Sequence, residues 1–404
     1  MLYVDVDFGI RNILSLPTAK PNPLHIAILG SRGIPNRYGG FEAFAERLSQ
    51  RLVEKGYRVS VYCRRAFTRP EDSELVDPRI RRVILPSITT KHLDTPLHTF
   101  ISILHVIFTD ADVVLIVNAA NSPFAWVPRL AGKPVVLNVD GLDRTRKKWG
   151  WLARIVLYIC ELMSLFTPTR IVTDARAIQE YYQRRYGKRS TMIAYGADAP
   201  GDAGATAQSE LASRRLKAGN YILYVSRMEP ENNPELILRA YQKLKTDWPL
   251  VMVGGNSYDP HYDARLRSLA TPGVIFTGPV YGDGYWALQK NAGMFIFACE
   301  VGGVHPALVE AMAAARPVLY LDTESNRETA NGCGIMFTRD EDDLASKISP
   351  LIADAGRRSQ IGQAAGEFAR QQYSWEKITE QYEELFWELK PGAATAPVSR
   401  KAGL

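Results

Sequence analysis

Short apolar runs alternate along most of the chain with stretches whose apolar positions recur at helical spacing. The runs are residues 24–29 (LHIAIL), 58–62 (RVSVY), 113–117 (VVLIV), 135–139 (VVLNV) and 170–173, then 221–225 (YILYV), 250–253, 274–277, 294–298 and 318–321. Near-continuous apolar runs predict parallel strands covered on both faces, and helical stretches such as 41–55, 152–166 and 175–186 lie between them. This alternation predicts an α/β fold of two Rossmann-like, doubly wound domains.

A change of composition marks the boundary between the two halves. Residues 199–207 (APGDAGATA) are rich in glycine, alanine and proline, as linkers are. We expect an N-terminal extension at 1–22, a first domain at 23–200, a linker at 201–220, a second domain at 221–374, a last helix at 375–390 and a flexible tail at 391–404. A cleft between the two domains is the default ligand site.

Composition narrows the class of protein. The 404 residues are 46% hydrophobic and 23% charged, which is typical of a folded chain. The four cysteines are scattered without metal-ligand spacing, which argues against a disulfide scaffold, a zinc site and an iron–sulfur centre. No run approaches the roughly 20 apolar residues of a spanning helix, and the N-terminus lacks the features of a secretory signal. We therefore expect a cytoplasmic protein.

The net charge of +6 suits a polyanionic partner such as a phosphorylated substrate or an anionic membrane surface. Attachment to the inner face of the cytoplasmic membrane is thus a further candidate location. Nothing beyond this modest charge indicates nucleic-acid binding, because no stacking motif accompanies it.

A glycine-rich segment, GSRGIPNRYGGFE (residues 30–42), follows the first predicted strand and ends where a helix begins. Glycines let a ligand approach the backbone closely, and the free amides of a helix start attract anions. The spacing is neither GxGxxG nor a Walker loop. A tight turn with a long insert would explain it too, but Gly39 and Gly40 beside two arginines favour an anion site.

Two segments of the second half have a similar character. In SRMEPENNPE (226–235), Arg227 stands at the carboxyl end of a predicted strand, where open α/β sheets bind ligands. A surface ion pair with Glu229 or Glu231 is its alternative. In CEVGGVHPALVEAM (299–312), a glycine pair leads into a helix whose Glu310 would face back toward the same pocket; a first-turn acid complementing the helix dipole is the alternative.

The chain resembles the retaining glycosyltransferases of the GT-B fold that use sugar nucleotides. The resemblance rests on Gly39-Gly40, on Arg227 and on the pair Glu300 and Glu310. The segments RGIPNRYGGFE, NVDGLDR (138–144), IAYGAD (193–198), EPENN (229–233) and EVGG (300–303) resemble the bacterial rhamnosyltransferase branch of polysaccharide assembly. The resemblance covers nearly all of residues 24–390.

The resemblance implies two domains facing each other across a cleft, with the last helix crossing back onto the first domain. It implies a nucleotide diphosphate sugar donor linked to dTDP, UDP or GDP, with dTDP-rhamnose as the first candidate. The acceptor would be a saccharide, in particular a lipid-diphosphate-linked one, and no metal or other cofactor would be needed. A leaving diphosphate oxygen would take the acceptor proton on the same face of the sugar, so that configuration is retained.

The resemblance also assigns residues. Arg227 would neutralise the leaving diphosphate, Glu300 would bind donor sugar hydroxyls, and Asp140 stands near the place where many relatives carry a histidine. The donor would be bound by Gly39, Gly40, Asn232, Val280, Tyr281, Gly302, Gly303, Val304 and Glu310. Asn232 replaces the lysine of most relatives, and Cys299, Val304 and His305 also depart from the branch.

A basic segment between the fourth predicted strand and the next helix indicates the acceptor or membrane side. It comprises Arg144, Arg146, Lys147, Lys148 and Trp149. Cations beside tryptophan suit an anionic lipid surface, although a solvated basic loop explains them nearly as well. The sequence Asp110-Ala111-Asp112 imitates a DxD metal motif, but its position before a strand favours a helix-to-strand connector.

Two other classes of function remain open. An NAD(P)-dependent oxidoreductase would also use Rossmann-like domains, although GxGxxG is absent and the second domain has a phosphate-type loop of its own. A non-catalytic nucleotide-sugar-binding module is compatible with the departures at Asn232, Cys299 and Val304.

Overall fold

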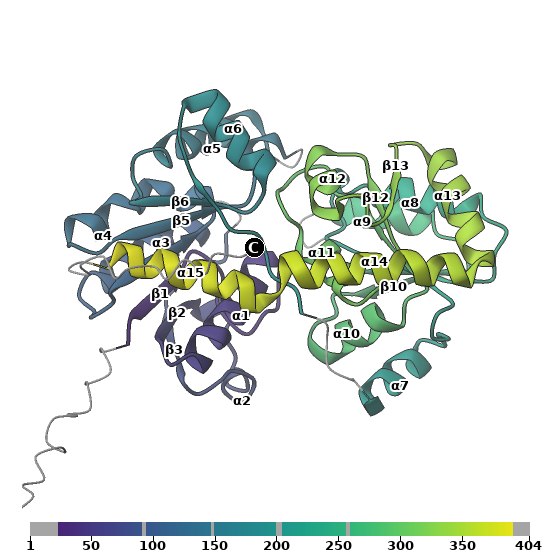
Figure 1. The fold of residues 1–404 in the computed structure, drawn as a ribbon, viewed down its shortest axis with the longest axis horizontal. Helices are drawn as coiled ribbons and strands as arrows, with labels where there is room; N and C mark the ends of the chain where they lie inside the picture. The colour runs from purple at the N-terminus through teal and green to yellow at the C-terminus, as the bar shows by residue number, and fades with distance from the viewer. Residues whose placement is uncertain (1–22, 91–93, 147–148, 199–203, 256–258, 391–404) are drawn as a thin grey trace, which may run out of the picture.

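The computed structural model of the protein describes residues 23–90, 94–146, 149–198, 204–255 and 259–390. The expectations for the extension at 1–22, the tail at 391–404 and the side chains of Lys147 and Lys148 lie outside the described residues. Figure 1 shows two α/β domains side by side, joined along the front by a pair of long helices.

The first domain is built on a parallel sheet of seven strands in the order β3-β2-β1-β4-β5-β6-β7. Its strands are β1 (His25–Leu29), β2 (Arg58–Arg64), β3 (Ile80–Leu85), β4 (Val113–Val117), β5 (Val135–Val139), β6 (Arg170–Thr173) and β7 (Thr191–Met192). Every residue of β1, β4 and β5 is buried, because helices cover both faces of these central strands. Register is direct, with Ile26 paired to Val59 on one side and to Val113 on the other.

Helices and short 3-10 turns connect these strands. They are α1 (Gly40–Glu54), η1 (Arg65–Phe67), α2 (Asp72–Leu75), α3 (Asp94–Val106), η2 (Ala119–Phe124), α4 (Trp126–Leu130), η3 (Asp143–Thr145), α5 (Trp151–Met163) and α6 (Arg176–Tyr186). In α1 the residues Phe44, Leu48 and Leu52 recur every fourth position and are buried, so helical periodicity matches the face turned to the core.

The second domain repeats the plan with six parallel strands in the order β10-β9-β8-β11-β12-β13. The strands are β8 (Ile222–Val225), β9 (Leu250–Val253), β10 (Val274–Gly278), β11 (Met294–Phe297), β12 (Val318–Leu321) and β13 (Ile335–Phe337). The connections are η4 (Pro230–Asn232), α8 (Pro234–Gln242), α9 (Pro260–Ser268), α10 (Gly282–Asn291), α11 (Pro306–Ala313), α12 (Glu324–Ala330), α13 (Glu341–Ala353) and α14 (Ala355–Tyr373).

The segment expected to be a linker, 201–220, contains a helix, α7 (Gly204–Ser213). The glycine- and alanine-rich start of the segment suggested a linker, but the residues after it (AQSELAS) are good helix formers. Figure 1 shows α7 at the lower edge of the second domain, beside α10.

The last helix, α15 (Trp375–Leu389), continues from α14 after a break at Ser374 and packs on the first domain. The ring of Trp375 lies against Gly196, where a Cβ would come within 2.5 Å of the indole. Further along the helix, the hydroxyl of Tyr382 accepts a hydrogen bond from Asn138 Nδ2 at 2.9 Å. Ala197 N donates to Tyr373 O at 2.6 Å, and Asp198 Oδ1 accepts from Trp375 N at 3.2 Å. The segment that leaves the first domain is therefore bonded to the segment in which the chain returns to it.

A second contact joins the domains farther out. The amides of Arg176 and Ala177, at the start of α6, donate to the carboxylate of Glu328 in α12 at 2.6 and 2.9 Å. A carboxylate at a helix N-terminus is favourable because it meets free amides and the positive end of the dipole. Within the described residues, no helix has the length and apolar character needed to cross a bilayer.

Candidate active site between the two domains

The order of the strands reverses between β1 and β4 in the first sheet and between β8 and β11 in the second. Crevices beyond the carboxyl ends of the strands at such reversals are where open α/β sheets bind ligands. The loop after β1 leads to Gly39 and Gly40, the loop after β8 carries Arg227, and the loop after β11 carries Glu300 to Val304. The topology thus brings the candidate donor-binding loops to the facing edges of the two sheets.

The glycine-rich loop of the first domain is held by carboxylates. Glu42 Oε1 accepts from Arg32 N at 2.7 Å, and burial raises the pKa of Glu42. Arg32 stacks on Tyr38 with its Cζ 3.4 Å from the ring centre, and Arg37 Nη2 pairs with Asp72 Oδ1 at 2.5 Å. These contacts shape the loop, and the segment ends at Gly39 and Gly40, where α1 begins.

The starts of α1 and α11 meet across the cleft. A Cβ added at Gly40, the first residue of α1, would lie 3.3 Å from Cγ of Pro306, the first residue of α11. Two helix N-termini in contact place free amides and two positive dipole ends in one region. Such a region favours a group with more than one negative charge.

The glycine pair after β11 is pressed against the first domain. Gly303 N donates to Asp140 O at 2.8 Å, and a Cβ at Gly302 would strike the ring of His305 at 2.4 Å. Val304 is buried behind the pair. The amide of Gly303, expected to bind diphosphate, is therefore engaged in an interdomain hydrogen bond in this structure.

Two carboxylates line the first-domain wall of the cleft. Asp140 and Asp174 follow the neighbouring strands β5 and β6. Asp174 is 1% exposed, and both of its oxygens lack a hydrogen-bond partner among the described residues. Burial raises the pKa of Asp174 well above its usual value, with the charge of Asp140 adding to the rise. Burial also raises the pKa of Asp140 to about 7, and the neighbouring Asp143 contributes.

Asp174 was not among the residues selected from the sequence. It belongs to no motif, yet one signal was present: it follows a predicted strand directly, as Asp140 does. Neighbouring parallel strands end at the same edge, so acids in these two positions come together.

Two arginines, one from each domain, lie near the same group of residues, which comprises Asp140, Cys299 and His305. Arg146 is nearly buried, with Nε 2.8 Å from Asp143 Oδ1, and its charge acts on Asp140, Cys299 and His305. Arg227 acts on the same three groups and lies 3.4 Å from Glu229 Oε1. The short turn η3 directs Arg146 toward the second domain, and its assignment to the acceptor or membrane side stays a prediction.

The asparagines of the second domain support the arginine loop. Asn232 Nδ2 donates to Arg227 O at 2.7 Å, while Asn233 Nδ2 donates to Glu300 Oε1 at 2.9 Å. Arg339 Nε lies 3.2 Å from the same Glu300 oxygen. Asn232 thus holds the backbone of Arg227 in place with a neutral amide, where a lysine would bring a positively charged ammonium group.

The remaining residues predicted to bind the donor lie around α10. Val280 and Tyr281 precede this helix, and the half-exposed Tyr281 is influenced by the charges of Glu42 and Arg32 across the cleft. Tyr285 donates to Glu310 Oε2 at 2.5 Å. Burial raises the pKa of Glu310 to about 7, although the hydrogen bond from Tyr285 opposes the rise.

The rest of the predicted basic segment is partly engaged inside the domain. Arg144 donates to Glu161 Oε2 at 2.8 Å and to Tyr181 Oη at 2.8 Å, and Trp149 is half-buried. Arg144 therefore has partners inside the first domain although its side chain is partly exposed, and its assignment to the acceptor or membrane side stays a prediction. Tertiary partners, Glu161 and Tyr181, set the direction of Arg144, whereas a local partner, Asp143, sets that of Arg146.

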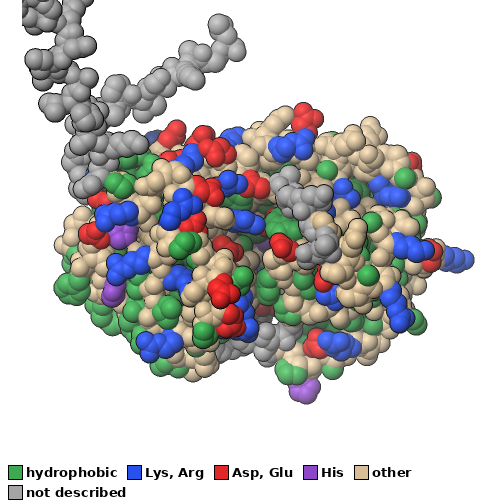
Figure 2. Space-filling view, turned by 90° about the horizontal axis from the view of Figure 1, so that it is seen from below, with side chains coloured by type: hydrophobic (Ala, Val, Ile, Leu, Met, Phe, Trp, Pro, Cys, Tyr) green, Lys and Arg blue, Asp and Glu red, His purple; other side chains and the backbone are tan. Residues whose placement is uncertain are grey.

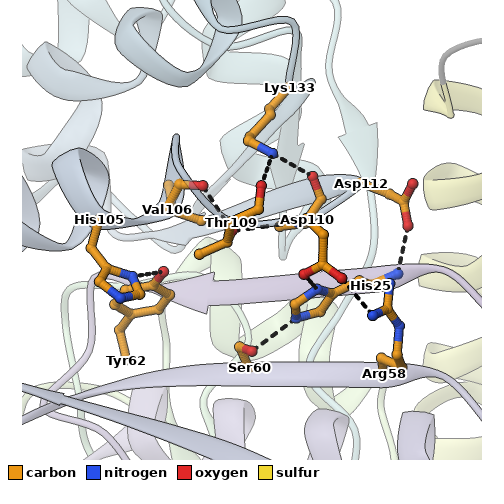
Figure 3. Close-up of polar contacts among 11 residues, drawn as sticks. His25, Arg58, Ser60, Tyr62, His105, Val106, Thr109, Asp110, Asp112 and Lys133 are labelled. Carbon is orange, nitrogen blue, oxygen red and sulfur yellow. Dashed lines mark hydrogen bonds and ion pairs between the residues drawn. The ribbon is translucent and has the colours of Figure 1, made fainter.

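The sequence Asp110-Ala111-Asp112, which resembles a DxD metal motif, lies at the amino-terminal edge of the first sheet, away from the candidate site (Figure 3). There Asp110 Oδ1 lies 2.8 Å from His25 Nδ1, and Asp110 Oδ2 accepts from Arg58 at 2.6 Å. Asp112 Oδ2 accepts from His25 N at 2.8 Å. Both acids therefore bind the start of β1 as a structural connector. Among the described residues, no group of three or more histidine, cysteine and acidic side chains is arranged to hold a metal ion.

Sequence comparison divides the chain at the same place as the fold. Residues 219–354 match the family described as glycosyl transferases group 1, and residues 24–198 match a domain of unknown function, DUF1972. The second domain is therefore similar in sequence to group 1 glycosyl transferases.

Two curated relatives illustrate the likeness. The O-antigen chain mannosyltransferase B of Escherichia coli is 27% identical over 168 residues, covering 40% of this chain and 44% of the relative. A GDP-mannose-dependent alpha-(1-6)-phosphatidylinositol monomannoside mannosyltransferase of Mycobacterium tuberculosis is 28% identical over 191 residues, covering 43% and 49%. The chain spans about half the length of the curated relatives it matches.

Solved structures match over almost the whole chain. Sucrose-phosphate synthase from Thermosynechococcus elongatus superposes with a TM-score of 0.75 at 18% identity, covering 91% of this chain and 99% of that one. Anabaena HepE in complex with UDP and glucose gives 0.72 at 14% identity, covering 91% and 100%. The predicted GT-B fold is thereby confirmed.

Proposed function

We propose that the protein is a sugar-nucleotide glycosyltransferase of polysaccharide or glycan assembly. The observation that carries the proposal is the meeting of two helix N-termini, at Gly40 and Pro306, beside Arg146 and Arg227 from opposite domains. Amides, dipole ends and guanidinium groups from both sides suit a diphosphate held between the lobes. The names of the mannosyltransferase relatives and the UDP complex of HepE are consistent with such a donor.

The finer proposal is transfer with retention of configuration and without a metal ion. The bond from C1 of the sugar to the diphosphate oxygen breaks, and a bond from C1 to the acceptor oxygen forms on the same face. The acceptor proton passes to the leaving diphosphate oxygen, so no protein nucleophile is needed. Arg227 and Arg146 would stabilise the negative charge that develops on the diphosphate. L-rhamnose from a dTDP-linked donor is the first sugar to test, and a lipid-diphosphate-linked saccharide is the first acceptor.

A donor panel tests the class directly. Thermal shift is measured with dTDP, UDP, GDP and NAD, followed by donor hydrolysis and transfer with the matching sugar nucleotides. We expect a nucleoside diphosphate to raise the melting temperature and NAD to leave it unchanged. Stabilisation by NAD alone would instead support an oxidoreductase, and donor binding without hydrolysis or transfer across the panel would support a non-catalytic binding module.

Two further measurements address the finer proposal. Activity should persist in excess EDTA; loss of activity that Mn²⁺ or Mg²⁺ restores would contradict metal independence. The anomeric configuration of the product, determined by NMR coupling constants, should equal that of the donor.

A further inference from the structure

The exposed apolar side chains of the protein are gathered on one part of the first domain. Sixteen large apolar side chains are exposed among the described residues, and only two of them, Tyr281 and Met336, belong to the second domain. Eleven lie between residues 100 and 166, on or beside α3, α4 and α5. Folded proteins rarely leave so many large apolar groups clustered on one face without a partner.

Helix α5 carries the densest part of this cluster. Its exposed residues are Trp151 (75%), Leu152 (61%), Ile155 (48%), Val156 (52%) and Ile159 (49%), which we call the α5 apolar face. Their spacing of four and one residues places them on one side of the helix. Figure 1 shows α5 beside α6 at the upper end of the first domain, away from α15.

The apolar surface continues beyond α5. Arg129 of α4 donates to Phe166 O and Thr167 O, both at 2.8 Å, which joins α4 to the chain that follows α5. Phe166 is 64% exposed, and Trp126 and Leu130 of α4 are exposed as well. The face is therefore broader than a single helix stripe.

The exposed charge of α5 itself and the charged residues of the adjoining hollow are basic. Arg154 is the single basic residue of α5 and is exposed, whereas its single acid, Glu161, is turned inward onto Arg144 Nε at 2.8 Å. Tyr186 also donates to Glu161, at 2.6 Å. A hollow of about 510 Å³ beside the face is lined by Arg144, Thr145, Arg154, Ile155, Tyr158 and Arg185. Three guanidinium groups thus surround a depression at the edge of an apolar surface.

We propose that the α5 apolar face inserts into the surface of an anionic lipid bilayer, with lipid phosphate groups at the arginine-lined hollow. Apolar side chains ringed by basic ones are the features that bind amphipathic helices to anionic membranes. A second copy of this chain fits the face less well, because pairing two such faces would bring Arg154 and Arg185 toward their own equivalents. The inference goes beyond the proposed function and stands independently of it, since it concerns a surface outside the cleft.

Flotation with lipid vesicles tests the proposal. The full chain is mixed with vesicles of phosphatidylglycerol and phosphatidylcholine, or of phosphatidylcholine alone. We expect it to float with the anionic vesicles, and less so as salt is raised. The double variant Ile155→Asp/Ile159→Asp should lower binding by about tenfold or more. The matched control Leu75→Asp/Met336→Asp, at two exposed apolar positions elsewhere, should bind as the unmodified chain does.

A second pair of variants examines the charges. Arg154→Glu/Arg185→Glu should reduce binding to anionic vesicles, whereas Arg239→Glu, on the exposed side of α8, should not. Quenching of tryptophan fluorescence by brominated lipids gives an independent readout, and Trp151→Phe should reduce it. This second readout remains informative if an aspartate variant is unstable.

Equal flotation of the unmodified chain and Ile155→Asp/Ile159→Asp, or no flotation of either, would overturn the proposal. So would a dimer in sedimentation velocity that the same double variant converts to a monomer. Because flotation needs neither donor nor acceptor, a failed glycosyltransferase assay leaves this result unaffected, and nucleotide binding should be the same in all of these variants.

Discussion

Asp174 and Gly303 face each other across the cleft so closely that a Cβ at residue 303 would lie 2.0 Å from Asp174 Oδ1. Gly303→Ala should therefore force the domains apart or displace the loop after β11, because the nearest atoms are a buried carboxylate and not the end of a flexible chain. We expect donor turnover to fall by tenfold or more. Gly150→Ala, where a Cβ meets nothing within 4 Å, should retain full activity. Small-angle scattering that shows an unchanged envelope, together with full turnover, would contradict this reading.

The buried carboxylate of Asp174 should make stability and activity change in opposite directions. Its burial without a partner disfavours the charged form, so the isosteric Asp174→Asn should raise the melting temperature at pH 8 by about 2–4 °C for each kcal/mol regained. Turnover should fall, because buried carboxylates with raised pKa values cluster at functional sites. The exposed Asp247→Asn should change neither. A lower melting temperature for Asp174→Asn would show that the carboxylate stabilises the fold.

Arg227→Ala should reduce turnover far more than stability. Loss of one preorganised charge contact to the leaving group typically costs about 3 kcal/mol, roughly a hundredfold in rate. The guanidinium is one-third exposed and its ion pair with Glu229 is long, at 3.4 Å, so little folding energy depends on it. Circular dichroism melting and steady-state kinetics are compared with Arg239→Ala. A melting shift large enough to account for the lost activity would reject the role.

The raised pKa of Glu310 predicts a pH dependence of stability. The pKa is about 7 in the folded protein and 4.5 when unperturbed, so between these values the folded chain holds a proton that the unfolded chain has released. The associated stability is complete below about pH 4.5 and is lost as the pH rises through about 7. Glu310→Gln should flatten the fall in melting temperature between pH 5 and pH 7.5. The exposed Glu384→Gln should keep the full slope; identical slopes for both variants would refute the prediction.

The hydrogen bond between Asn138 and Tyr382 should contribute to the attachment of α15. Tyr382→Phe leaves the buried amide of Asn138 without its acceptor, which costs about 1–3 kcal/mol of unfolding free energy. Urea unfolding measures the loss. Adding Asn138→Leu removes both polar partners, so the double variant should recover much of the stability. Equal stability of Tyr382→Phe and the unmodified chain would show that the bond is of no consequence.

Much of the fold could be predicted from the sequence because its central strands are buried on both faces. The runs 113–117 and 135–139 coincide with β4 and β5, and the last helix begins at Trp375 as expected. β3 was not predicted, since two consecutive arginines interrupt the apolar residues of IRRVIL at the edge of the sheet. β7 and β13 are only two and three residues long, too short for a periodic signal.

The candidate site could be predicted less completely. Glycines and Arg227 were found because they occur in loops directly after apolar runs. The partners of Arg144 and Arg146 could not be predicted, because sequence spacing does not show which way a side chain turns, and Glu161 and Asp143 decide that. Asp174 carried no motif, and its importance depends on Gly303, which lies more than a hundred residues away in the sequence.

The net charge of the sequence did not indicate where on the surface a partner would bind. Figure 2 shows basic and acidic side chains intermingled over the face seen from below, so the net charge of +6 is not gathered into one patch on that face. The exposed apolar side chains, in contrast, are distributed unevenly, with most of them on the first domain. Overall composition does not show such a distribution.

The hydrogen bonds that join Ala197 to Tyr373 and Asp198 to Trp375 tie both covalent crossings together at one place. Two domains fastened at this point are restricted in how far one can shift along the other. The same pairs of residues from the two domains are therefore kept opposite each other.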